Sequence, residues 1–415
     1  MLKTLTALLL LAPVTAQAFT KCDLTDIGGP GAQIAEEGSN PIVSGEWAYA
    51  GFVQADKVVI LTANKSGANQ QPLQTIFQGT DAMRGKNAVS TDLRLAAEGK
   101  YLYATWHYGP KIAEHLMVAV NSSHGNPRHW SPALDLGVSR GSLPQISADG
   151  SNVHIASVSK DGHTLVSSSS DNGKTFGAPV DLGKGNGEVV IASLGQDVYV
   201  AWEFGRQDQY PSVEYGVSHN NGASFTVSNI SDNGKRIAHE PIFSLNRQTG
   251  RLSLVWREDL PQIATYLQST DHGNTWSTPL TVDDDSRQVM VQDLGDKIYV
   301  SYLKDYTTDS GKDWQVQIAI SSDGGKTFPE IHNLSGPTGV SKIVGDNARP
   351  VPWAGGGQVR VTGIKADGAY IWSGRAGKVN ANAVYLGPGE LASPQGNVAL
   401  WQEPEGVVTY AYCHQ

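Results

Sequence analysis

The sequence predicts an all-β protein, and three observations identify its architecture as a β-propeller of four-stranded blades. A short box recurs along the chain as SSDNGKTF, SHNNGASF, STDHGNTW and SSDGGKTF, at 169–176, 218–225, 269–276 and 321–328. The third residues of these copies are separated by 49, 51 and 52 residues, a period typical of propeller blades. Between the boxes lie short runs such as DVYVAW (197–202), rich in β-branched and aromatic residues and bounded by turn formers, which is the pattern of strands.

Weaker copies of the box extend the repeat toward both ends of the chain. They read TANKSGAN at 62–69, NSSHGN at 121–126 and SGRAGKVN at 373–380. Each box is expected between the third and the outer strand of a blade. Seven boxes or remnants therefore predict a seven-bladed ring, with six or eight blades as alternatives because residues 20–60 are hard to assign to strands.

The two ends of the chain are expected to share one blade, which closes the ring. Residues 396–412 read as an inner and a second strand with no strand after them, and residues 46–79 read as a third and an outer strand. Cys22 and Cys413 are the only cysteines, and a disulfide between them would lock this blade in an oxidising compartment. Two free thiols are the alternative.

Residues 1–18 have the pattern of a cleavable signal peptide. Lys3 provides the positive start, residues 5–14 form an apolar stretch too short to span a bilayer comfortably, and AQA (16–18) has the small residues that a signal peptidase reads. We therefore expect residues 19–415 to form one exported propeller domain, periplasmic or secreted. Because Cys22 does not directly follow the cleavage point, no lipid anchor is expected.

The composition excludes several function classes. The formal net charge is −9 and basic runs are missing, so neither nucleic acid nor an anionic membrane is an expected partner. The 11 histidines show no metal-ligand spacing, and no metal or cofactor is expected. Asp283, Asp284 and Asp285 are consecutive and could bind Ca²⁺, but consecutive acidic side chains point apart, which favours solvated carboxylates.

The pattern Ser-x-Asp-x-Gly-x-Thr-(Trp/Phe) resembles the Asp-box, or BNR, repeat over essentially the whole chain after the signal peptide. Proteins with this repeat include sialidases, other glycan-processing propellers and non-enzymatic propellers. We expect the box to be structural: an acceptor for backbone N–H groups two residues on, a glycine with positive φ, and an aromatic packed between sheets. In box order, these residues are Asp171, Gly173 and Phe176; Asn220, Gly222 and Phe225; Asp271, Gly273 and Trp276; and Asp323, Gly325 and Phe328.

Strand parity places function on the face opposite the boxes, which carries the loops between second and third strands and the links between blades. Four of these links bring an arginine to the start of an inner strand, and Arg94 is a looser fifth case; the four are Arg140, Arg236, Arg287 and Arg349. Converging guanidiniums would bind a carboxylate or a sulfate. The alternative is local pairing with Glu240, Asp285 or Asp346. Aromatic side chains available to stack on sugars are Tyr108, Phe204, Tyr210, Tyr306 and Trp314.

Two functions fit this face, and whether the protein is an enzyme is left open. Sialidases usually carry a Phe/Tyr-Arg-Ile-Pro motif near the start of the mature chain, and this sequence has none. A propeller that binds a glycan or a protein partner is therefore favoured, and a scaffold for envelope assembly would look the same in sequence. The alternative is a sialidase-like hydrolase or a lyase acting on acidic glycans, with Glu203, Glu240, Glu258, Tyr210 and Tyr306 as candidate catalytic residues.

Overall fold

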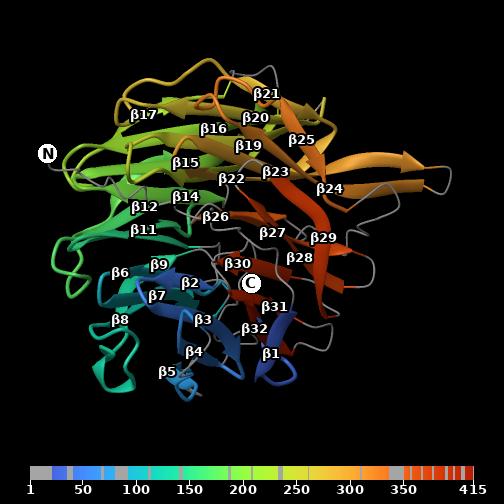
Figure 1. The fold of residues 1–415 in the computed structure, drawn as a ribbon. Helices are drawn as coiled ribbons and strands as arrows, with labels where there is room; N and C mark the ends of the chain where they lie inside the picture. Colours follow the sequence, from blue (N-terminus) through green and yellow to red (C-terminus); the bar gives the residue numbers. More distant parts are fainter. Residues whose placement is uncertain are drawn as a thin grey trace, which may run out of the picture.

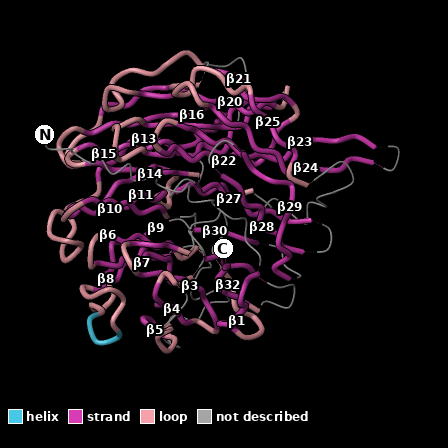
Figure 2. The backbone as a smooth tube through the Cα atoms, in the orientation of Figure 1, coloured by secondary structure: helices cyan, strands magenta, loops and turns pink. Residues whose placement is uncertain are grey.

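The computed structural model describes residues 21–34, 41–66, 70–79, 92–110, 114–139, 144–185, 188–206, 209–231, 237–259, 261–308, 311–335, 350–355, 358–365, 368–375, 378–387, 391–395, 398–402 and 407–414. They form eight four-stranded antiparallel sheets that follow one another around a ring, so the predicted β-propeller is confirmed (Figure 1). Eight blades is one of the alternatives allowed by the repeat, not the seven that it favours. Helical structure in the described part is limited to one 3-10 turn, η3 (Pro127–His129), shown in cyan in Figure 2.

The first four blades follow the sequence order. Blade 1 holds β2 (Ile42–Ser44), β3 (Trp47–Gln54), β4 (Lys57–Asn64) and β5 (Gln74–Gln78). Blade 2 holds β6 (Arg94–Glu98), β7 (Tyr101–Tyr108), β8 (Glu114–Asn121) and β9 (Leu134–Ser139). Blade 3 holds β10 (Gln145–Asp149), β11 (Asn152–Val158), β12 (His163–Ser169) and β13 (Val180–Lys184). Blade 4 holds β14 (Val189–Leu194), β15 (Asp197–Arg206), β16 (Gln209–Ser218) and β17 (Thr226–Asn229).

The remaining blades include the one that closes the ring. Blade 5 holds β18 (Ile237–Leu245), β19 (Leu252–Asp259), β20 (Ile263–Ser269) and β21 (Leu280–Asp284). Blade 6 holds β22 (Ser286–Leu294), β23 (Lys297–Thr308), β24 (Gly311–Ser321) and β25 (Glu330–Asn333). Blade 7 holds β26 (Val351–Gly355), β27 (Gln358–Lys365), β28 (Gly368–Arg375) and β29 (Lys378–Gly387). Blade 8 combines β30 (Leu391–Gln395), β31 (Val398–Gln402) and β32 (Val408–His414) with β1 (Lys21–Gly28).

Blade 8 is shared between the two ends of the chain, as predicted, but its strands differ from those expected. β1 pairs antiparallel with β32 as the outer strand (Figure 1). Cys22 lies opposite Cys413 and is joined to it by a disulfide. Residues 46–79 instead belong to the complete blade 1. The count of boxes predicted seven blades instead of eight, because each box lies on the connection between the third and the outer strand of a blade. In blade 8 that connection does not exist, since β32 ends the described chain and β1 begins it.

Buried tryptophans fill the spaces between blades. Trp106, Trp202, Trp256 and Trp401 all lie on second strands and are at most 1% exposed. At the closure, apolar residues of β31 and β32 pack with apolar residues of β3 and β4 in one cluster. Each sheet thus buries both faces against its neighbours, which explains why second strands such as YLYATWHY (101–108) are nearly continuous apolar runs.

The four close boxes form the same turn, which Asp171 illustrates. The amide of Gly173 donates to Ser169 Oγ at 3.0 Å, and the amide of Thr175 donates to Asp171 Oδ1 at 3.0 Å. The expected acceptor role for the third box residue is therefore right, but its donor is four residues on, because the box serine takes the nearer amide. The same two bonds recur at Gly222 and Ser224, Gly273 and Thr275, and Gly325 and Thr327.

The glycine and the aromatic of each box connect neighbouring blades. Gly273 has φ +78°, and a Cβ there would lie 2.1 Å from Tyr215 Oη of the preceding blade. Trp276 packs edge-on against the Tyr215 ring at 5.0 Å between centroids, and Phe328 packs in the same way against Tyr266. The boxes thus pack neighbouring blades together, as expected from their residue types.

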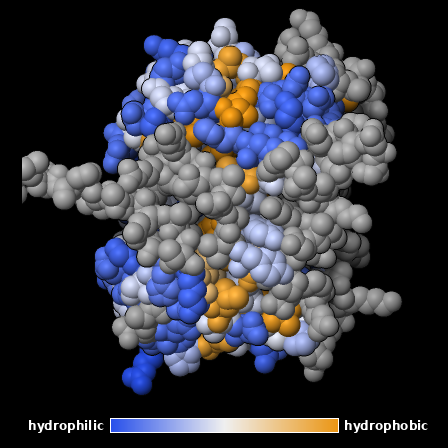
Figure 3. Space-filling model, turned by 45° about the vertical axis from the view of Figure 1, so that its right-hand side comes forward, coloured by the Kyte–Doolittle hydropathy of each residue, from blue (hydrophilic) through white to orange (hydrophobic). Residues whose placement is uncertain are grey.

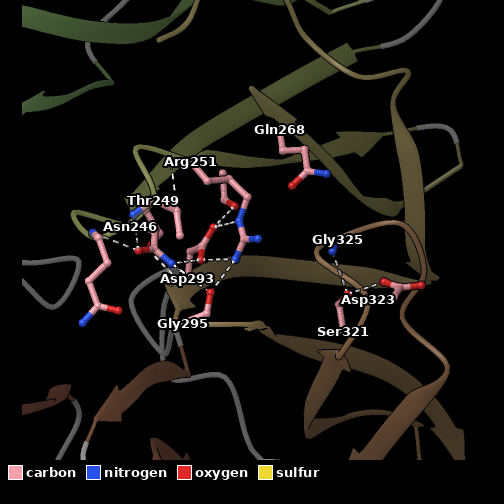
Figure 4. A network of polar contacts seen from close by, with 12 residues as sticks. Asn246, Thr249, Arg251, Gln268, Asp293, Gly295, Ser321, Asp323 and Gly325 are labelled. Atoms are coloured by element: carbon pink, nitrogen blue, oxygen red, sulfur yellow. Dashed lines mark hydrogen bonds and ion pairs between the residues drawn. The ribbon is translucent and has the colours of Figure 1, made fainter. Parts of the chain in front are cut away.

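The boxes also mark one face of the ring. The amides of Asn172 and Asn221 donate to Ser151 O and Gln196 O, which lie in the turns between first and second strands of the same blades. On this face Arg251, at the start of blade 5's second strand, binds Asp293 on the first strand of blade 6 (Figure 4). We call it the box face; the opposite face carries the loops between second and third strands.

Exposed apolar side chains are scattered over the described surface. Figure 3 shows apolar residues in small groups among hydrophilic ones. Leu24, Val227 and Ile331 are 50%, 43% and 44% exposed and lie on outer strands of different blades. Within the described part of the chain, no helix has the length and apolar character needed to span a membrane.

Candidate functional site

Charged side chains of blades 4 and 5 meet on the face opposite the boxes. Glu203 lies near the end of β15, His239 and Glu240 near the start of β18, and Arg257 and Asp259 near the end of β19. All of these strand ends adjoin interblade links or loops between second and third strands. We call these five residues the His239 cluster. Their side chains are 10–27% exposed, so they are reachable but largely withdrawn from solvent.

His239 is held between two carboxylates. Its Nδ1 is 3.0 Å from Glu203 Oε1, and its Nε2 is 3.6 Å from Asp259 Oδ2. The hydrogen bond to Glu203 raises the pKa of His239, although burial and the nearby Arg257 oppose this change. The contact to Glu203 fixes Nδ1 as the protonated nitrogen of the neutral ring, and Nε2 then carries the lone pair.

A bulge in β18 sets the direction of these side chains. The pairing of β18 with β19 shifts register between His239 and Ile242, and Glu240 inside the shift has φ +58°. Such a conformation is costly for a residue with a Cβ, and bulges of this kind redirect side chains. As a result Glu240 Oε1 lies 3.4 Å from Arg257 Nη1. The Nε of the same arginine lies 3.3 Å from Asp259 Oδ1.

The neighbouring blade 6 repeats the bulge one blade further on. The register of β22 with β23 shifts between Arg287 and Met290, and Gln288 has φ +51°. Arg287 thus occupies in blade 6 the position that His239 occupies in blade 5. Its guanidinium lies over the Trp314 ring at 4.9 Å, and Trp314 is only 8% exposed.

The acidic run at 283–285, at the end of blade 5, is paired with a cation from the neighbouring blade 6. Lys304 Nζ donates to Asp283 at 2.7 Å and to Asp284 at 2.8 Å, and the Tyr302 hydroxyl donates to Asp283 at 2.8 Å. The hydrogen bond from Lys304 lowers the pKa of Asp284. Two of the three carboxylates are therefore paired with Lys304, whereas solvated side chains were expected. Among the described residues, no set of three or more His, Cys, Asp or Glu side chains is arranged to hold a metal ion.

Of the arginines proposed from sequence, the structure places Arg287 on the expected face. Arg140, Arg236 and Arg349 lie outside the described residues. Arg94 is 1% exposed inside blade 2, beside Asp92, whose carboxylate contacts the Nδ1 of buried His107. Burial raises the pKa of Asp92, but the hydrogen bonds and charge of His107, together with the charge of Arg94, outweigh this effect and leave the pKa below its usual range.

The candidate catalytic residues proposed from the sequence also lie in different places. Glu203 and Glu240 belong to the His239 cluster. Glu258 is 7% exposed and accepts bonds from Trp256 Nε1 and Thr265 Oγ1, so it belongs to the interior of blade 5. Tyr210 and Tyr306 lie in β16 and β23, and their side chains are outside the described part.

Of the three aromatic residues proposed for sugar stacking whose side chains are described, two are buried. Tyr108 is 6% exposed and packs edge-on against Phe77 at 4.9 Å between centroids, and Trp314 lies beneath Arg287. Phe204 is partly buried in β15.

His239, Arg257 and Asp259 were missed in the sequence. Their signal was polar residues at strand ends on the face that strand parity selects, in the segments IAHEP (237–241) and REDLPQ (257–262). No spacing rule links them, because the cluster draws residues from three strands of two blades.

The comparisons with known proteins support the fold. No protein-family model matches the chain, and no curated protein matches it either. Among solved structures, the chain is similar to an ulvan lyase of polysaccharide lyase family PL25, with TM-score 0.53, 14% identity, and 85% of this chain and 94% of that one covered. The same kind of lyase bound to -[GlcA(1-4)Rha3S]- has TM-score 0.50 and 15% identity, covering 88% and 95% of the two chains. The polysaccharide lyase Uly1 has TM-score 0.53 and 7% identity, covering 92% and 90%. At these identities the likeness shows a shared β-propeller fold.

Proposed function

We propose that this protein cleaves an acidic polysaccharide by elimination, at the face opposite the boxes, with His239 as the group that transfers the proton. The observation that carries the proposal is the His239 cluster. An imidazole is fixed by Glu203 through Nδ1, while Nε2 has Asp259 3.6 Å away and lies on a partly exposed surface. A histidine oriented in this way by a carboxylate is a suitable general base.

The partners of the carboxyl groups in the His239 cluster favour elimination over hydrolysis. A glycosidase needs one carboxylic acid that stays protonated to donate to the leaving oxygen. Glu203 is paired with His239, and Glu240 and Asp259 are paired with Arg257, so each carboxyl group already has a nitrogen partner. The imidazole, rather than a carboxyl group, is then the cluster's proton carrier.

In the proposed reaction, His239 Nε2 removes the proton from the carbon next to a uronate carboxylate. The electron pair forms a carbon–carbon double bond, the bond between the adjacent carbon and the glycosidic oxygen breaks, and the leaving oxygen takes up the proton that His239 Nε2 has removed. Arg287 is the described cation on the neighbouring inner strand that would hold the anionic substrate, because its guanidinium is fixed against Trp314.

This proposal differs from the binding module favoured by the sequence. A binding face needs no oriented imidazole, whereas the β18 bulge keeps Glu240 in a costly backbone conformation beside His239. Solved polysaccharide lyases with the same fold support the choice of substrate class. We also propose that the protein reaches this substrate after export through residues 1–18.

The test is a cleavage assay on ulvan and on a panel of other uronate-containing polysaccharides. We expect an unsaturated product that absorbs in the near ultraviolet, and a loss of about 100-fold or more in kcat for His239→Ala. The matched control is His163→Ala, which removes a partly exposed histidine that is likewise paired with a carboxylate, Asp181, in blade 3. Binding without cleavage across the panel would favour the binding module. Reducing ends without the unsaturated product would establish hydrolysis and overturn the elimination mechanism.

A further inference from the structure

A groove runs between blades 2 and 3 on the box side of the ring. It consists of two adjoining hollows of about 450 and 350 Å³, which share Leu134 and Lys174 in their linings. Volumes of this order accommodate one or two sugar rings. None of the five residues of the His239 cluster lines either hollow.

One wall of the groove is built by residues 129–134, the segment that follows the weak box of blade 2. The connection between β8 and β9 contains η3, drawn in cyan at the end of β8 in Figure 2, and Trp130 follows it directly. Trp130 Nε1 donates to Gln74 Oε1 of blade 1 at 2.8 Å, which fixes the indole. Tyr101 stacks on buried Tyr103 at 6.2 Å between centroids. Both Trp130 and Tyr101 are partly exposed and line the larger hollow.

The other wall is the intact box of blade 3. Asn172, with φ +61°, and Gly173, with φ +75°, form the tip of its turn, and exposed Lys174 follows. The hydrogen bonds of this turn keep Asp171 ionised: the bond from the Thr175 hydroxyl, above all, lowers its pKa to about 2. Lys174 is therefore presented by a rigid turn rather than by a loose loop.

The charge of the groove indicates an anionic ligand. Lys174 and His129 line it, and Lys100 Nζ lies 5.4 Å from the centre of the Tyr101 ring. The acidic residue in its lining, Asp135, contacts His115 Nδ1 at 2.8 Å. Fixed aromatic faces beside a cation are the combination that binds a charged sugar, because the ring covers the apolar face of the sugar and the cation pairs with its acid group.

We propose that this groove is a second polysaccharide-binding site, on the face away from the His239 cluster, which holds an anionic glycan chain. Tyr101 and Trp130 stack on the sugar rings, and Lys174 pairs with a carboxylate or a sulfate. The nature of the ligand rests on the proposed function, but the groove itself does not. A polymer held here would keep the enzyme on its substrate while cleavage takes place at the opposite face.

The chain provides a matched control for Lys174. Lys326 has the equivalent position in the box of blade 6, is also exposed and lines neither hollow. Lys174→Glu and Lys326→Glu therefore make the same charge change in the same type of turn. Both variants are first compared with the parent protein by thermal unfolding, and equal Tm values show that the fold is intact.

The experiment measures retardation of the two variants in gels containing ulvan. We expect Lys174→Glu to weaken the apparent affinity about fivefold or more and Lys326→Glu to leave it within twofold. Tyr101→Ala should weaken it by a similar factor, and Tyr101→Phe should restore it, because a stacking role needs the ring and not the hydroxyl. Equal retardation of both lysine variants would overturn the proposal.

Failure of the groove and failure of the proposed function give different results. If His239→Ala abolishes cleavage while Lys174→Glu still binds like Lys326→Glu, the groove proposal is wrong and the catalytic proposal stands. If no uronate polymer is cleaved but ulvan binding depends on Lys174 and Tyr101, the catalytic proposal is wrong and the groove proposal stands.

Discussion

The guanidinium of Arg251 donates two hydrogen bonds of 2.6 Å to Asp293, one to each carboxylate oxygen, and joins blade 5 to blade 6 (Figure 4). The Asp293 side chain is fully buried, and it also accepts bonds from Ser253 Oγ and Asn246 Nδ2. A planar cation matched to a fully bonded carboxylate is the arrangement in which a buried ion pair is well satisfied. The box face is therefore fastened by polar groups as well as by aromatic packing.

Removal of Asp293 should be costly for stability. In Asp293→Ala the guanidinium of Arg251, whose side chain is 11% exposed, loses its partner, and we expect a loss of about 3–5 kcal/mol in the free energy of unfolding. Arg247→Ala is the comparison, because Arg247 pairs with Asp149 while its side chain is 46% exposed, and such pairs contribute about 1 kcal/mol or less. Denaturant unfolding followed by tryptophan fluorescence measures both. Equal losses would show that burial does not control the cost.

The glycine of a box should tolerate no side chain. Gly273→Ala combines a positive φ with a Cβ 2.1 Å from Tyr215 Oη, and we expect a loss of about 2–4 kcal/mol. Gly295→Ala, with φ +63° and no atom within 4 Å of the new Cβ, isolates the backbone effect and should cost about 1–2 kcal/mol. The difference between the two Tm shifts measures the contact between blades 4 and 5. A difference near zero would contradict the close approach.

The disulfide should stabilise the ring mainly through its closure. Cys22 and Cys413 are separated by 391 residues, and chain entropy sets an upper limit of about 6 kcal/mol for such a loop. We expect a reducing agent to lower the Tm of the parent protein and to leave the Tm of Cys22→Ser/Cys413→Ser unchanged. In the oxidised state the double variant should melt at the temperature of the reduced parent. A reductant-independent Tm in the parent would mean that strand pairing alone closes blade 8.

The cleavage rate should depend on pH through His239. A general base must be deprotonated, and because Glu203 raises the pKa of His239 above its usual 6.5, kcat/KM should rise with pH along a limb displaced to the alkaline side of that value. Glu203→Gln removes the carboxylate, so the limb should move to lower pH. The same pair stabilises the fold while His239 is protonated, and this contribution is lost as the pH rises through the raised pKa. A limb that stays in place in Glu203→Gln would exclude His239 as the base.

The sequence revealed the repeating part of this fold and missed the exceptions to it. Period and turn chemistry identified the propeller and the shared blade, because each box repeats the same local interactions. Blade 8 was not counted among the predicted blades, because its third and outer strands are not joined by a turn that could carry a box. Its outer strand was assigned wrongly for the same reason: KCDLTDIG (21–28) carries no box beside it.

The candidate site was less predictable than the fold. Glu203 and Glu240 could be proposed because carboxylates near strand ends are visible in the sequence. Asp259 and His239 could not be paired with them, because the β18 bulge that brings them together has no sequence signature beyond HEP (239–241). Contacts between residues 36 positions apart, such as Glu203 and His239, follow from blade geometry and not from local pattern.

The pairing of β1 with β32 also imposes an order of events on biosynthesis. β1 is made before any other described strand, and its partner Val408–His414 is made after all the others. β1 therefore has no strand to pair with while the first seven blades are synthesised. Closure of the ring therefore cannot precede the synthesis of the last described strand. Under the export proposed above, this delay would be an advantage, because the polypeptide cannot complete its ring before β32 has crossed the membrane.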